Sequence, residues 1–180
     1  MKHPFRWVAL AVAAGVCVLA VVLAVTVSSD PHSEQNTSRL VGKRAPKFSV
    51  VALDGTKITS ANLAGKTVLV NFWNSWCIPC RQEHDALVAW YAQHQDEPDV
   101  VLLGIVREDN RDNVRRYVKD NGVTWPIAFD PGGKAALDFG TRGQPETYAI
   151  GPAGVVAASK FGPATAKTLD SMVTYAQGAG

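Results

Sequence analysis

The feature that most constrains the fold is a nearly continuous apolar run, Val68–Trp73, which leads into Trp76-Cys77-Ile78-Pro79-Cys80. An apolar run of this length is typical of a strand that is buried on both faces of a sheet. Pro79 favours the first turn of a helix, because its missing N–H is no loss at that position. We therefore expect a buried strand followed at once by a helix over Pro79 to about Gln95.

Strand and helix patterns alternate along the rest of the chain. The expected strands are Phe48–Leu53, Val100–Val106, Ile127–Phe129, Thr147–Ile150 and Val155–Lys160, and the expected helices are Asp112–Asn121, Lys134–Phe139 and Ala164–Gln177. Strands alternating with helices, then a hairpin, predict an α/β fold with a central mixed β-sheet flanked by helices. We assign these elements to one domain, residues 40–180.

The N-terminal segment predicts a membrane anchor. Trp7–Val27 is 21 residues without a charge, whereas signal-peptide cores run about 7–15 residues and a spanning helix needs about 20. We expect a cytoplasmic stub and transmembrane helix in residues 1–27, with a long signal peptide as the alternative, and a flexible linker over 28–39. Lys2 and Arg6 precede the run, so the positive-inside rule predicts a single-pass protein of the cell membrane whose domain is extracytoplasmic.

Charge and cysteine content exclude other classes. The net charge is +2, and Lys2 and Arg6 account for it, because 16 basic and 16 acidic residues balance beyond Val27. We expect no polyanion-binding surface and no nucleic-acid partner. Three cysteines are too few for a disulfide scaffold, but two of them lie close together, which indicates chemistry.

The close pair predicts thiol chemistry. Cys77 is expected at a helix N-terminus, where unpaired N–H groups and the helix dipole favour a thiolate, the attacking species. Cys80, one turn further in, should be more buried and resolve the mixed disulfide. A structural disulfide or half of a zinc site with His84 are the alternatives. Haem attachment is rejected, because Arg81 stands where a histidine is needed.

Two segments carry a resemblance to a known family. Val70 to Glu83 resembles the active-site segment of the membrane-anchored thioredoxin-like proteins called DsbE, ResA and TlpA, and Gly143 to Ile150 supports the match. The resemblance covers about Ala45 to Val173 and implies a thioredoxin-like fold. It implies that Pro145 is the family's cis-proline, which would expose the Gln144 backbone for pairing with an extended substrate.

The resemblance also implies function. It implies a thiol:disulfide oxidoreductase that reduces apocytochrome c before haem attachment, with electrons from a membrane-embedded donor protein. The Cys77–Cys80 disulfide is the redox group, with no cofactor and no metal. Among the substrate-binding candidates, Trp76 would offer an apolar surface, and Glu146 would shape substrate choice or be a surface turn acid.

Proton transfer from Cys80 needs a nearby acid–base group. Asn71 stands where thioredoxin has an aspartate, so Glu83, whose helical face includes Leu87 and Trp90, is the candidate. The alternative for Glu83 is a solvent-facing acid at the helix N-terminus. Asn71 would order the active-site backbone or satisfy a local hydrogen bond, and His84 is interpreted as an ordinary helix-face residue.

Other functions remain open at this point. The pair could serve a broad-specificity disulfide oxidase or reductase of exported proteins, because direction depends on reduction potential. A thiol peroxidase and a metal-binding protein using Cys77, Cys80 and His84 are further alternatives.

Overall fold

The computed structural model describes residues 12–21 and 38–178, in two units that lie within Met1–Gln35 and Asn36–Gly180. The first unit contributes a helix over residues 12–21. Within these ranges, no helix has both the length and the apolar character that crossing a bilayer requires. Most of the expected anchor, and residues 28–37 of the expected linker, lie outside the described residues. Ser38 already belongs to the second unit, because its N–H donates to Ser159 Oγ at 2.8 Å.

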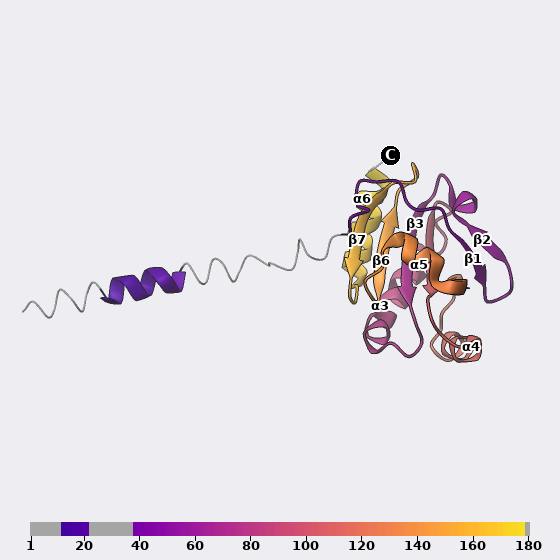
Figure 1. Ribbon diagram of the computed structural model, residues 1–180, viewed down its shortest axis with the longest axis horizontal. Helices are drawn as coiled ribbons and strands as arrows, with labels where there is room; N and C mark the ends of the chain where they lie inside the picture. Colours follow the sequence, from indigo (N-terminus) through magenta and orange to yellow (C-terminus); the bar gives the residue numbers. More distant parts are fainter. Residues whose placement is uncertain (1–11, 22–37, 179–180) are drawn as a thin grey trace, which may run out of the picture. The chain divides into compact units, whose positions relative to one another are not determined.

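The second unit is built on one seven-stranded sheet with the order β2-β1-β5-β4-β3-β6-β7 (Figure 1). Strands β3, β4 and β5 run parallel, and the outer pairs run antiparallel. The strands are β1 (Ser49–Ala52), β2 (Lys57–Thr59), β3 (Thr67–Trp73), β4 (Val100–Val106), β5 (Ile127–Phe129), β6 (Glu146–Ile150) and β7 (Val156–Phe161). The expected mixed sheet is therefore confirmed.

Four α-helices accompany the sheet in this unit: α3 (Ile78–His94), α4 (Arg111–Asp120), α5 (Lys134–Phe139) and α6 (Ala166–Gly178). All four were expected within about two residues of these bounds. Strand β2 and the short 3-10 helix η1 (Ser60–Leu63) were not expected. The β2 segment is only three residues long and has a single apolar residue, Ile58, so it carries no readable alternation.

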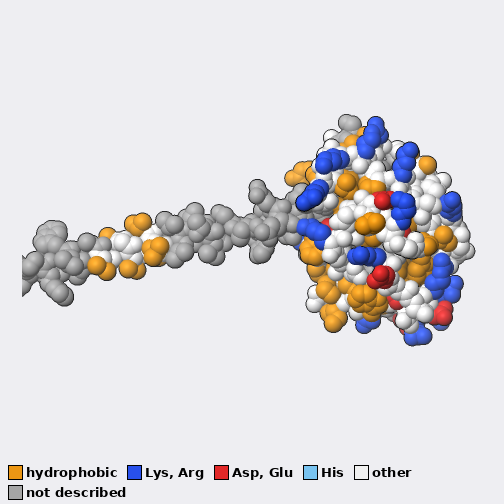
Figure 2. Space-filling view, in the orientation of Figure 1, with side chains coloured by type: hydrophobic (Ala, Val, Ile, Leu, Met, Phe, Trp, Pro, Cys, Tyr) orange, Lys and Arg blue, Asp and Glu red, His pale blue; other side chains and the backbone are white. Residues whose placement is uncertain are grey.

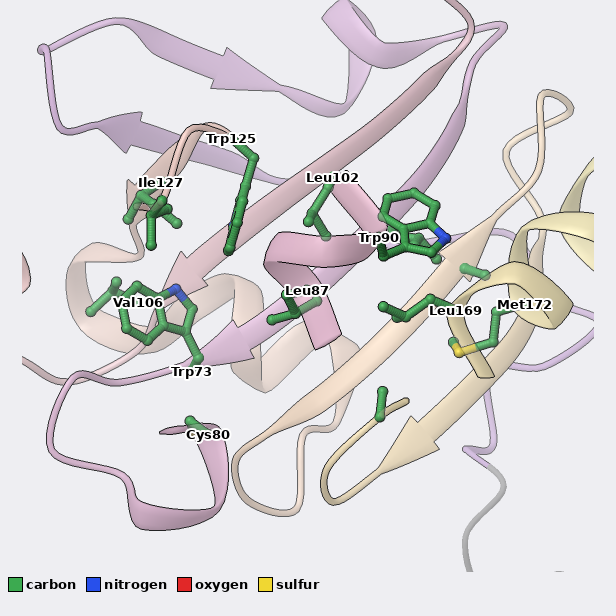
Figure 3. Close-up of a cluster of buried hydrophobic side chains, with 14 of the residues drawn as sticks. Trp73, Cys80, Leu87, Trp90, Leu102, Val106, Trp125, Ile127, Leu169 and Met172 are labelled. Carbon is green, nitrogen blue, oxygen red and sulfur yellow. The ribbon is translucent and has the colours of Figure 1, made fainter. Parts of the chain in front are cut away.

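The two faces of β3 explain its apolar sequence, because both are covered. Leu69 and Trp73 belong to a core with α3 and α6 residues, and Figure 3 shows Leu87 and Trp90 of α3 and Leu169 and Met172 of α6 in this cluster. Val68, Val70 and Phe72 belong to a second core that includes residues of α5. Asn71, on the α3 side, is a polar residue in the middle of the strand and is 1% exposed.

Candidate active site

The cysteine pair lies where β3 passes into α3, as expected. Cys77 is the N-cap of α3, Pro79 lies in the first turn, and the two cysteines form a disulfide with an S–S distance of 2.09 Å. The backbone N–H of Cys80 points at Cys77 Sγ, 3.2 Å away. When the pair is reduced, this N–H and the helix dipole favour negative charge on Cys77, not on Cys80.

The expectation that Cys80 is more buried than Cys77 is wrong. In the disulfide form, Cys77 is 3% and Cys80 is 4% exposed. Cys77 is covered because its Sγ lies 3.6 Å from the carbonyl oxygen of Gln144 in a separate loop. The neighbouring side chains Trp76 and Ile78 are 57% and 71% exposed, so two apolar side chains flank Cys77 at the surface.

The Gln144–Pro145 peptide bond is cis, as the resemblance implied. Gln144 is half-buried and places its carbonyl oxygen against Cys77. The interpretation of Glu146 as a surface turn acid is wrong, because Glu146 is 0% exposed. Its carboxylate accepts from the backbone N–H of Arg142 at 2.8 Å and lies 3.3 Å from the Arg142 guanidinium. Glu146 therefore stabilises the loop that contains Pro145. Because its carboxylate is buried, it would affect a substrate only through the position of this loop.

Glu83 is buried on the core side of α3, which excludes the solvent-facing alternative. Its two oxygens accept hydrogen bonds from Asn71 Nδ2 at 2.8 Å and from the backbone N–H of Ala164 at 2.9 Å. Burial raises the pKa of Glu83 to about 7, against the opposing effect of these two hydrogen bonds. A carboxyl group with this pKa exchanges its proton near neutral pH, which suits a general acid–base.

Asn71 holds Glu83 in place. It also donates to Thr147 Oγ1 at 2.9 Å, so its amide joins β3 to both α3 and β6. Cys80 and Glu83 line the same small space behind the disulfide, together with Trp73, His84 and Tyr117. A proton path between the acid and the inner cysteine would run through this space.

The interpretation of His84 as an ordinary residue on a face of the helix agrees with the structure, where it lies on the buried face of α3 with Cys80 and Leu87. His84 is 8% exposed, and its ring packs against Tyr117 and Trp125 with centroids 5.3 and 6.0 Å apart. Its Nε2 donates to the carbonyl oxygen of Asn121 at 2.7 Å, which ties α3 to the end of α4. Among the described residues, no group of three or more His, Cys, Asp or Glu is placed to hold a metal ion.

Sequence reasoning missed the loop between β4 and α4. Asn74 Oδ1 accepts from the backbone N–H groups of Arg107 and Glu108, both at 3.2 Å. Asp109 Oδ2 accepts from the Ser75 N–H at 2.6 Å, and Trp76 Nε1 donates to the Glu108 carbonyl at 3.0 Å. These contacts fix the three residues that precede Cys77. The sequence separation of about 34 leaves no local signal for them.

A polar groove lies beside Trp76, between α3 and α4. It encloses about 450 Å³ and is lined in part by Trp76, Arg81, Asp85, Arg116 and Tyr117. Arg81 donates to the Ser75 carbonyl at 2.8 Å and lies 5.7 Å over the Tyr117 ring.

A parallel strand that ends at a Cys-Ile-Pro-Cys helix start, opposite a cis-proline loop, defines the class of thiol:disulfide oxidoreductases with a thioredoxin-like fold. The chain belongs to the AhpC/TSA family, whose sequence model matches residues 41–159.

Named relatives agree with this class. The chain is 32% identical over 140 residues to the thioredoxin-like protein YneN of Bacillus subtilis, covering 77% of this chain and 82% of that protein. It is 34% identical over 140 residues to the thiol:disulfide interchange protein HelX of Rhodobacter capsulatus, covering 76% of each. It is 32% identical over 130 residues to the thiol-disulfide oxidoreductase ResA of Bacillus anthracis, covering 72% of this chain and 75% of that protein.

Solved structures confirm the thioredoxin-like fold. A thiol:disulfide interchange protein of the thioredoxin family from Chlorobium tepidum superposes with a TM-score of 0.66 at 31% identity, covering 79% of this chain and 99% of that one. StoA from Bacillus subtilis superposes with a TM-score of 0.63 at 27% identity, covering 71% of this chain and 96% of that one.

Proposed function

We propose that this protein reduces disulfides of exported proteins outside the cytoplasm, with apocytochrome c as its substrate and a membrane-embedded protein as its electron donor. The observation that most supports this proposal is the disulfide at the start of α3. The Cys80 N–H points at Cys77 Sγ, and Glu83 is buried one turn beyond Cys80. The apocytochrome assignment rests on the resemblance to the DsbE, ResA and TlpA proteins. The membrane location rests on the apolar run Trp7–Val27.

The proposed reaction begins with the reduced pair. The Cys77 thiolate attacks one sulfur of the substrate disulfide, forming a mixed disulfide and releasing the other substrate sulfur as a thiolate. Cys80 then loses its proton toward Glu83, attacks Cys77 Sγ and frees the second substrate sulfur. Two electrons pass to the substrate, and the Cys77–Cys80 disulfide remains, as in the structure. A dithiol of the membrane-embedded donor then reduces this disulfide by the reverse exchange.

Substrate recognition in this scheme uses the surroundings of Cys77. The half-buried Gln144 backbone next to the cis peptide bond would pair with an extended substrate segment. Trp76, which is exposed and held by the Glu108 carbonyl, would pack against apolar side chains of that segment.

A trapping experiment tests the function. Full-length Cys80→Ser protein should accumulate mixed disulfides through Cys77, because the resolving thiol is gone, whereas Cys77→Ser protein should trap almost nothing. Apocytochrome c should be among the trapped proteins. Its consistent absence, with other exported proteins trapped, would reject this substrate and leave a broad-specificity reductase or oxidase. Measuring the reduction potential then separates those two, because a high potential favours an oxidase.

A further inference from the structure

Basic residues are concentrated in the first part of the folded unit. Residues 38–66 contain six Lys or Arg and one acid, whereas residues 67–178 contain ten Lys or Arg and thirteen acids. The balance of charge over the whole chain conceals this asymmetry of +5 against −3. Figure 2 shows several Lys and Arg side chains spread over the domain face in view, with few acidic side chains between them.

Three of these basic residues line one groove. Arg44, Lys47 and Lys66 surround an opening of about 420 Å³ whose lining includes Pro46, Leu63 and Pro152, and no acidic residue lines it. Lys43 is exposed beside it. We call this surface, made of Lys43, Arg44, Lys47, Lys66 and the apolar residues between them, the basic groove.

None of the basic-groove residues forms an ion pair within the described part of the chain. Ion pairs engage Arg115, Lys134 and Arg142, but no ion pair involves Lys43, Arg44 or Lys47. Lys66 donates to the backbone carbonyl of Pro98 at 2.9 Å, a contact with no opposite charge. The basic groove therefore presents four basic side chains around apolar residues. This arrangement is complementary to a surface whose outer groups are anionic and whose interior is apolar.

The basic groove lies at the opposite end of the central strand from the disulfide. Lys66 directly precedes β3, and Cys77 follows its far end. Seven residues of strand separate the two ends by about 20 Å. The hairpin residues Gly151–Gly154, which join β6 to β7, also line the groove.

The chain itself leads from the apolar N-terminal run to this groove. After Ser38, the N–H groups of Gly42 and Ala45 bond to the carbonyls of Val156 and Gly154 and carry the chain along the hairpin. Residues 28–37, between Val27 and Ser38, span at most about 36 Å when extended. A membrane that holds Trp7–Val27 is therefore within reach of the basic groove.

We propose that the basic groove docks on the anionic phospholipid headgroups of the membrane that anchors the chain. This docking depends on the membrane anchor of the proposed function. It would also fix how the folded unit is oriented on the membrane. The disulfide then faces away from the bilayer, toward extracytoplasmic partners. The basic groove must therefore detach from the membrane before a membrane-embedded donor can reduce the Cys77–Cys80 disulfide. Each basic residue near an anionic surface strengthens binding about fivefold.

Amine footprinting of the full chain tests the docking. The protein is mixed with vesicles of phosphatidylcholine alone or of equal parts phosphatidylcholine and phosphatidylglycerol, and lysine acylation is read by mass spectrometry. Lys43 and Lys47 should react ~3-fold or more slowly with the anionic vesicles, and Lys134 and Lys167 should not change. About 0.5 M NaCl should remove the protection, because salt screens exposed charges.

Two matched variants sharpen this test. Arg44→Gln with Lys66→Gln should weaken the protection of Lys43 and Lys47, while Arg115→Gln with Lys119→Gln, which removes the same charge from α4, should preserve it. Equal acylation in both lipids, equal protection of Lys134, or the same protection by inorganic phosphate alone would each overturn the docking. Failure to float with phosphatidylcholine vesicles would reject the anchor, and the anionic vesicles would still report on the groove.

Discussion

The pKa of Glu83 makes the stability of the oxidised protein depend on pH in a specific direction. The folded-state pKa is about 7, against 4.5 for an ordinary glutamate. Between these values the folded protein binds a proton that the unfolded chain does not, so the free energy of unfolding falls as pH rises. At about 1.4 kcal/mol per pKa unit, the loss between pH ~4.5 and ~7 is roughly 3 kcal/mol.

Glu83→Gln isolates this contribution. The amide cannot ionise, and it leaves one of the donors Asn71 Nδ2 and Ala164 N–H without an acceptor, a cost of about 1–3 kcal/mol at every pH. Urea unfolding from pH ~4.5 to ~8.5 should therefore show the wild type losing roughly 3 kcal/mol more than the variant. Asp85→Asn, on the exposed side of α3, should follow the wild type. Parallel curves for wild type and Glu83→Gln would refute the raised pKa and the proton role built on it.

Three further predictions test the surroundings of the site. Asn71→Leu removes a hydrogen bond that lowers the pKa of Glu83, so the pH midpoint for resolving the mixed disulfide should rise above that of the wild type. Asp109→Ala leaves the Ser75 N–H without its acceptor, so it should slow alkylation of Cys77 and lower the free energy of unfolding in urea by about 1–3 kcal/mol. The control Asp112→Ala, which removes an exposed ion pair with Arg115 on α4, should lower it by under ~1 kcal/mol. Leu169→Ala in the core should cost about 2–5 kcal/mol, and Tyr175→Ala on the exposed side of α6 should cost much less.

The sequence predicted six of the seven strands, the four helices around the sheet and the position of the cysteine pair, because these depend on local patterns. The apolar run of β3 signals burial on both faces, and Pro79 signals a helix start. Glu83 was found because helical spacing places it with Leu87 and Trp90, and all three are buried.

Local sequence patterns could not predict contacts between segments that are distant in the sequence. Glu146 and His84 look like surface residues by type, but Arg142 and the Asn121 carbonyl provide partners that make their burial favourable. The burial of Cys77 depends on Gln144, 67 residues away. The basic groove escaped notice because overall charge says nothing about how charges are distributed.

The acidity of Cys77 is the property on which the proposed exchange depends. The direct measurement is the rate of Cys77 alkylation against pH in the reduced full-length protein, with Cys80→Ser to isolate the first thiol. A helix N-terminus and the Cys80 N–H predict a midpoint well below the ~8.5 of a free cysteine. A midpoint at or above that of a free cysteine, with no faster alkylation near neutral pH, would contradict the account.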